Sequence, residues 1–106
     1  MTPKDAPEIN ALLMSLWERG LPQVRERLEV LDRAATAAAS GKLTEDLQAE
    51  ALEITHKFAG SLGMFGYTEG TEVAQQLEQV LENPTLERSS KVAGLVVQLR
   101  RALQLE

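Results

Sequence analysis

The residue of this chain best suited to chemistry is its one histidine, His56. A neutral imidazole can attack an electrophile through one ring nitrogen near pH 7. Read as a helix, the surrounding stretch places apolar residues three and four positions apart, which indicates a stripe facing a core. The stripe consists of Leu47, Ala51, Ile54, Phe58, Leu62 and Phe65. At 100° per residue, His56 lies roughly 165° from the centre of this stripe, so we expect an exposed imidazole that a second macromolecule can reach.

The residues expected beside His56 on the outer face of this helix are mostly small. They are Ala49, Leu52, Glu53, Ala59, Gly60 and Gly63. A glycine inside a helix costs about 1 kcal/mol relative to alanine, so Gly60 and Gly63 need a physical reason. They could allow a neighbouring helix to approach, but both lie on the histidine face, which favours close approach by an outside partner. We assign the six residues to a partner-binding surface.

Several residues around the histidine also share the register of a known family. They are His56, Gly60, Ser61, the Phe65-Gly66 pair and the Leu77-Glu78 pair. This pattern resembles the histidine-containing phosphotransfer (HPt) domains of two-component phosphorelays, including those of chemotaxis kinases. The resemblance covers roughly residues 45–82, and the helices predicted on either side fit the same architecture.

The resemblance implies that His56 is a phosphoacceptor. It would accept a phosphoryl group from, and donate it to, aspartates of receiver domains in response regulators or hybrid histidine kinases. A histidine kinase catalytic domain is a second expected partner. The receiver would bring its own Mg²⁺, so we expect no cofactor on this chain. Because phosphoryl transfer depends mainly on positioning and charge neutralisation, the chain is expected to be a carrier without autonomous catalysis.

Two further residues could assist the imidazole. In chemotaxis-type relatives a glutamate lies 22 positions after the histidine, and here that residue is Glu78. It falls about 115° from the core direction of its own helix, where it could accept a hydrogen bond from the Nδ1–H of His56 or simply be solvated. Most of the family carries lysine three residues after the histidine, where this chain has Ala59. Lys57 is the nearest cation, about 100° around the helix, and its long side chain could support the phosphoryl group.

Composition and charge argue against other functions. The formal charge of −5 disfavours binding to nucleic acid or anionic membranes, which requires basic patches. The absence of cysteine excludes disulfides and thiolate metal sites, and we predict no metal site around the lone histidine. We find no signal peptide pattern and no apolar run near the ~20 residues needed to span a bilayer. We expect one domain over residues 1–106, cytoplasmic and monomeric.

The apolar spacing predicts helices throughout and no sheet. Residues 1–7 should be a loose segment, followed by a short helix that Gly20 ends and a longer helix from Pro22 to about Ser40. Three more helices should follow, and their expected caps are Thr44, Thr68 and Asn83-Pro84. Short connections make successive helices antiparallel. We therefore predict an all-α fold, an up-down antiparallel four-helix bundle with an additional short N-terminal helix.

Two other functions are compatible with the sequence. The chain could be a non-phosphorylated HPt-like interaction module that binds and regulates a kinase or receiver domain, and Ala59 is the main support for this alternative. It could also be a structural bundle inside a larger protein, which the glycines of the outer face argue against.

Overall fold

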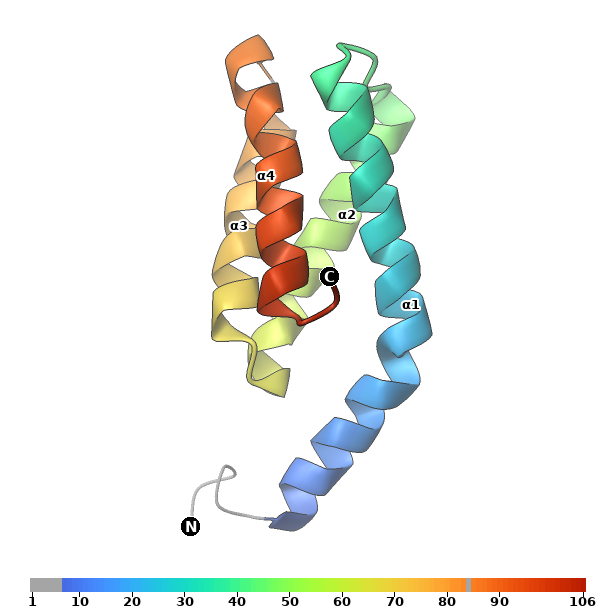
Figure 1. The fold of residues 1–106 in the computed structure, drawn as a ribbon, viewed down its shortest axis with the longest axis vertical. Helices are drawn as coiled ribbons and strands as arrows, with labels where there is room; N and C mark the ends of the chain where they lie inside the picture. The colour runs from blue at the N-terminus through green and yellow to red at the C-terminus, as the bar shows by residue number, and fades with distance from the viewer. Residues whose placement is uncertain (1–6, 84) are drawn as a thin grey trace.

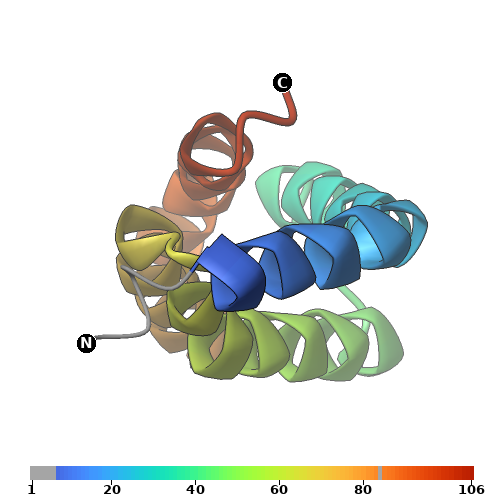
Figure 2. The same cartoon turned by 90° about the horizontal axis from the view of Figure 1, so that it is seen from below.

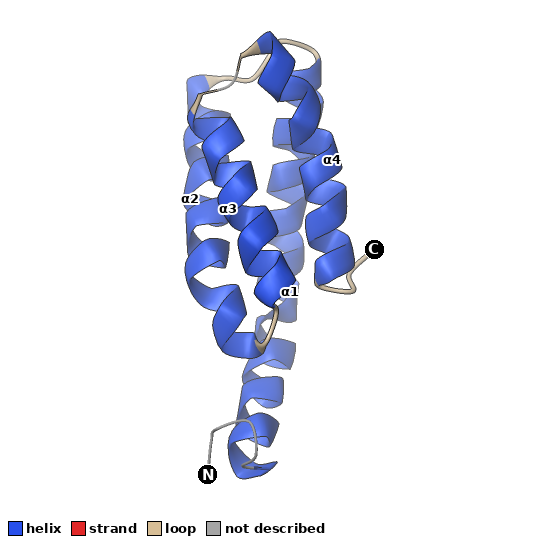
Figure 3. Ribbon diagram, turned by 90° about the vertical axis from the view of Figure 1, so that its left-hand side faces the viewer, coloured by secondary structure: helices blue, strands red, loops and turns tan. Residues whose placement is uncertain are grey.

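Four α-helices make up most of the described part of the chain, which comprises residues 7–83 and 85–106 of this computed structural model (Figure 1). The helices are α1 (Pro7–Ala39), α2 (Glu45–Ser61), α3 (Thr68–Glu82) and α4 (Leu86–Ala102), with a short 3-10 helix, η2 (Leu62–Phe65), after α2. α1 and α3 each pack against both α2 and α4, so the four helices surround one core. Figure 3 shows successive helices running up and down, with no strand in the described residues. The predicted all-α four-helix bundle is confirmed.

The core is built from the apolar stripes of all four helices, as the three-four spacing predicts. Its largest fully buried apolar side chains are Leu28, Leu31, Phe58, Leu62, Leu77, Leu81, Val92, Leu99 and Leu103. One correction concerns the apolar stripe predicted around the histidine: Leu47 of α2 and Phe65 of η2, expected at the core, are half-buried, whereas Thr55 of α2 is fully buried. The Thr55 hydroxyl donates to the carbonyl oxygen of Leu52 at 3.0 Å, so this buried polar group is satisfied.

The prediction of a separate N-terminal helix is wrong, because α1 is one continuous helix of 33 residues with Pro22 inside it. Neither Gly20 nor Pro22 ends the helix. A proline in a helix interior removes one backbone hydrogen bond and its ring displaces the carbonyl four residues earlier, here that of Glu18. The usual result is a kink, and α1 changes direction in this part of the chain in Figure 1.

The segment of α1 before this kink extends past the end of the bundle (Figures 1 and 2). It is held there by Trp17, whose ring lies 5.4 Å from the ring of Phe65 and 4.8 Å from that of Tyr67. Pro7, predicted to belong to the loose segment 1–7, is instead the first residue of α1. The rest of that predicted segment, residues 1–6, lies outside the described residues.

The helix caps agree with the sequence at α2 and differ at α3 and α4. The hydroxyl of Thr44 accepts the backbone N–H of Leu47 at 3.1 Å, which confirms the predicted cap of α2. Thr68 is not a cap but the first residue of α3. At α4 the cap is Thr85 rather than Asn83, with its hydroxyl accepting the N–H of Arg88 at 3.2 Å. Pro84 lies outside the described residues.

A tight turn brings α3 back alongside α2. Gly66 follows η2 with φ of 89°, a left-handed conformation that glycine adopts without strain. The first turn of α3 then packs closely because its Gly70 has no side chain. A Cβ on Gly70 would lie 3.2 Å from Leu62 Cδ1 and 3.4 Å from Leu103 Cδ2. This packing sets α3 beside α2, where the two helices face each other along their length.

Candidate functional site

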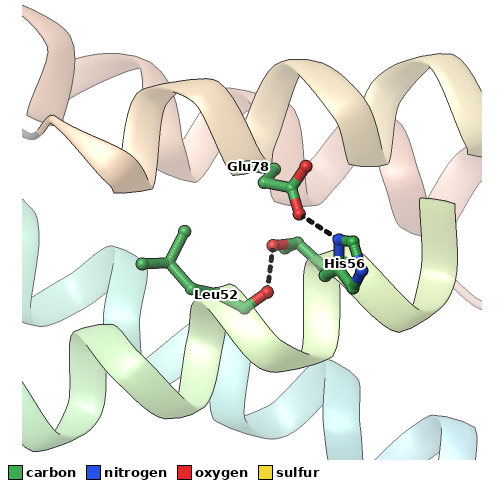
Figure 4. Close-up of polar contacts among 4 residues, drawn as sticks. Leu52, His56 and Glu78 are labelled. Carbon is green, nitrogen blue, oxygen red and sulfur yellow. Dashed lines mark hydrogen bonds and ion pairs between the residues drawn. The ribbon is translucent and has the colours of Figure 1, made fainter.

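The imidazole of His56 on α2 faces the carboxylate of Glu78 on α3 (Figure 4). The distance from His56 Nδ1 to Glu78 Oε2 is 2.9 Å. The contact predicted from the sequence between these two residues is therefore present. It bridges 22 positions in the chain, and only the antiparallel packing of α2 and α3 brings the two side chains together.

The two members of this pair differ in exposure, as a surface nucleophile with a fixed partner would require. The His56 side chain is 81% exposed and that of Glu78 is 23% exposed. An ionised carboxylate can only accept hydrogen bonds, so the 2.9 Å contact assigns the proton to Nδ1 of the imidazole. Nε2 then carries the lone pair, and it belongs to a ring that is open to solvent.

Lys57 is directed to another part of the surface. Its Nζ lies 3.0 Å from Glu53 Oε1, one helical turn earlier on α2. Lys57 and Glu53 also line a groove between α1 and α2, whereas Glu78 lies on α3. In this structure Lys57 therefore pairs with a carboxylate rather than pointing at the imidazole. An exposed ion pair of this kind contributes only about 0–1 kcal/mol to the free energy of unfolding.

The two glycines of the predicted partner surface leave open space. A Cβ on Gly60 would meet nothing within 4 Å, and one on Gly63 would meet only Thr71 Oγ1 at 3.5 Å, an ordinary contact. Helix packing inside the bundle therefore does not require a glycine at either position. For Gly60, this result removes the interpretation that the glycine lets a neighbouring helix approach. Gly60 and Gly63 are both exposed and form a strip of the surface with Ala49 and Glu53.

The other four residues assigned to that surface divide into two groups. Ala49 and Glu53 are exposed on α2, as predicted. Leu52 and Ala59 are half-buried and pack partly against the core. They are less accessible than expected because the buried face of α2 is centred nearer to Thr55 than the apolar pattern indicated.

The helix pair that carries this site is strongly acidic. The carboxylates between residues 45 and 82 are Glu45, Asp46, Glu50, Glu53, Glu69, Glu72, Glu78 and Glu82, against a single cation, Lys57. This helix pair therefore supplies little positive charge of its own around the imidazole.

Other kinds of site find no support in the described residues. No three histidine or acidic side chains there come together in a way that could hold a metal ion. In the same ranges, no helix is both long and apolar enough to cross a membrane.

One contact near the site was not anticipated from the sequence. The side-chain amide of Gln48, eight residues before His56 on α2, donates from Nε2 to the carbonyl oxygen of Leu81 on α3 at 2.7 Å. A glutamine on a helix flank carries no sequence signal of such a bond, since its partner is a backbone atom 33 residues away.

Comparison with known proteins agrees with this geometry. The family model of the Hpt domain matches residues 15–105. The chain is 35% identical over 68 residues to "Protein RcaC" of Microchaete diplosiphon, an alignment that covers 64% of this chain and 10% of the relative. The chain thus spans about a tenth of the length of the curated relative it matches, and no solved structure matches it significantly. Hpt domains have a phosphotransfer role in two-component signalling and interact with receiver domains and kinases. Because the family model covers most of its length, this chain belongs to the Hpt domain family.

Proposed function

We propose that this domain carries a phosphoryl group on Nε2 of His56 and exchanges it with aspartates of receiver domains. The observation that carries the proposal is the pairing of a highly exposed imidazole with a half-buried carboxylate at 2.9 Å through Nδ1. This arrangement presents one nucleophilic nitrogen to an outside partner and holds the other in a hydrogen bond. The membership of the chain in the Hpt domain family supports the same function.

The transfer uses the two ring nitrogens differently. The Nε2 lone pair forms a bond to the phosphorus of a receiver's aspartyl phosphate, and the bond from phosphorus to the aspartate oxygen breaks as the carboxylate leaves. The ring keeps its Nδ1–H and becomes an imidazolium that bears the phosphoryl group. Glu78 stabilises this positive charge through the charge-assisted hydrogen bond. In the reverse direction the same proton makes the imidazole a good leaving group.

The domain itself supplies little charge neutralisation, and we propose that it has no autonomous catalysis and binds no cofactor. Phosphoryl transfer needs positive charge around the transferred group. Lys57 pairs with Glu53, and Ala59 stands where most of the family has lysine. We expect the receiver's Mg²⁺ and its own cations to fill this role.

The docking surface proposed for the receiver is the exposed strip that contains Ala49, Glu53 and Gly60 of α2 and Gly63 of η2. Leu52 and Ala59 form its half-buried floor. The open space at Gly60 lets a partner's backbone or side chains approach the helix beside the imidazole. A histidine kinase catalytic domain that phosphorylates His56 would have to reach the same strip, and we propose that the domain meets either partner as a monomer.

A second candidate is a non-phosphorylated module that uses this strip to bind a kinase or receiver. Ala59 and the Lys57–Glu53 pair favour it, because they leave the imidazole without an adjacent cation. Binding without labelling of His56 would distinguish this module from a carrier.

The decisive experiment is incubation of the domain with radiolabelled, phosphorylated receiver domains and Mg²⁺. A carrier acquires phosphate that is labile to acid and stable to base, as expected for phosphohistidine, and loses it to unphosphorylated receiver. Absence of label across a panel of receivers that bind the domain would favour the interaction module instead.

A further inference from the structure

Two side-chain hydrogen bonds join α2 to α3 in the described residues. One is the His56–Glu78 contact, and the other runs from Gln48 Nε2 to the carbonyl oxygen of Leu81. The Gln48 bond is short, at 2.7 Å, and is partly buried. Hydrogen bonds shielded from water resist exchange better than exposed ones, so this bond can hold the two helices together.

The carbonyl that Gln48 contacts has no partner within its own helix. α3 ends at Glu82, so Leu81 lies among the last residues, whose carbonyls lack the usual helical N–H. In a continuing helix, the carbonyl oxygen of Leu81 would accept the N–H of Thr85, four residues later. That N–H instead donates to the carbonyl oxygen of Asn83 at 3.0 Å. Gln48 therefore supplies from α2 the donor that the end of α3 is missing.

The turn stabilised in this way is the turn that carries Glu78. Helical hydrogen bonds join each residue to the one four positions later, so Glu78 begins the final turn of α3, which ends at Glu82. The backbone of Gln48 is held in the first turn of α2, since its N–H donates to the carbonyl oxygen of the capping residue Thr44 at 2.9 Å. Gln48 thus ties the last turn of α3 to the first turn of α2.

We propose that Gln48 is a positioning residue for the phosphotransfer site and acts through Glu78. By holding the last turn of α3 against α2, its amide keeps the Glu78 carboxylate within hydrogen-bond reach of His56 Nδ1. The imidazole is otherwise open to water, so its tautomer and ring orientation depend on that carboxylate. This inference rests on the proposed function of His56, but the geometry it concerns exists without any phosphate.

The first test measures the tautomer of His56 by nitrogen-15 NMR in the unphosphorylated domain alone, at a pH where the imidazole is neutral. Gln48→Met keeps the length of the side chain and removes the donor. It should shift the ring from the Nδ1–H form toward the Nε2–H form. Gln48→Lys retains a donor and should stay close to the parent protein. Gln76→Leu, a change to an exposed glutamine elsewhere on α3, is the matched control and should have no effect.

The second test separates positioning from general loss of structure. At saturating receiver, Gln48→Met should lower the rate constant of phosphotransfer by about tenfold, since small misplacements of a reacting group are costly. In a Glu78→Ala background the same change should have no further effect, because the residue through which it acts is already gone.

The outcomes are decisive in either direction. An unchanged tautomer in Gln48→Met overturns the inference, as does an equal slowing in both backgrounds, which would indicate a structural role independent of Glu78. The NMR measurement needs no phosphate or partner. Failure of His56 to accept phosphate would therefore refute the proposed function and leave the result on Gln48 standing.

Discussion

Lys57 and Glu53 form an ion pair between neighbouring turns of α2, with 3.0 Å between Nζ and Oε1. The pair lies beside the α1–α2 groove, whereas His56 contacts Glu78 of α3. The only cation of the α2–α3 pair is thus engaged by a carboxylate, and the phosphoryl group proposed for His56 has no free lysine of its own helix beside it.

Ala59→Lys should therefore lengthen the lifetime of phosphohistidine. A lysine three residues after His56 lies about one turn away, where it can pair with phosphoryl oxygens. Exposed ion pairs contribute up to about 1 kcal/mol, so we expect a two- to fivefold slower hydrolysis. The measurement is the decay of labelled domain after removal of the receiver. Lys57→Met is the control and should leave the decay unchanged; a faster decay in Lys57→Met would show that Lys57 leaves Glu53 to support the phosphate.

His56→Gln should abolish phosphate uptake with little effect on folding. The side chain is 81% exposed, and surface substitutions usually change the free energy of unfolding by no more than about 0.5 kcal/mol. Labelling by phosphorylated receiver and urea unfolding are the two measurements. Retained label would refute the carrier proposal, whereas a large loss of stability would show that the imidazole contributes to the core.

Gly60→Leu should weaken receiver binding while improving the stability of the helix. A side chain at Gly60 meets no neighbour within 4 Å, and leucine gains somewhat under 1 kcal/mol of helix propensity over glycine. Gly94→Leu is the matched control, because Gly94 is equally open but lies on α4. Both variants should unfold at higher urea concentration, and only Gly60→Leu should raise the dissociation constant of the receiver. Equal affinities would place the docking surface elsewhere.

Gly63→Leu should have the same effect on binding. Gly63 lies on the same strip, but a side chain there would contact Thr71 Oγ1 at 3.5 Å, so its gain in stability should be smaller than that at Gly60. Titration of receiver against both variants gives the comparison. A variant that loses stability and binds normally would mean that Gly63 serves packing against α3.

Glu78→Ala should slow phosphotransfer by about ten- to hundredfold, the range expected when a group that orients and stabilises a reacting imidazole is removed. Folding should change little, because the contact with His56 is exposed. Glu72→Ala removes an exposed carboxylate from the same helix and controls for the change in charge. The comparison is the single-turnover rate from phosphorylated receiver. If both variants slow transfer equally, the effect comes from net charge and not from the hydrogen bond.

The exposure of His56 and the helical fold could be predicted from the sequence alone. Both follow from local rules, since the spacing of apolar residues along a helix decides which face it buries. The Thr44 cap is equally local, because its hydroxyl bonds a backbone N–H three residues later. The errors on α2 centre on Thr55, a polar residue that can be buried because its hydroxyl bonds its own helix. Its burial moves the buried face toward Leu52 and Ala59, which are half-buried and not exposed as predicted.

Tertiary structure decided the features that depend on how one helix is placed against another. Sequence placed Glu78 on a flank of its helix, but the rotation and register of α3 against α2 determine that it faces His56 instead of solvent. The bond from Gln48 to the carbonyl of Leu81 has the same origin. α1 continues through Pro22 because packing on the bundle and the Trp17 contacts hold both of its parts, which outweighs the local preference of Gly20 and Pro22 to end a helix. Local preferences act over a few residues, whereas these contacts join residues far apart in the chain and form only when the bundle closes.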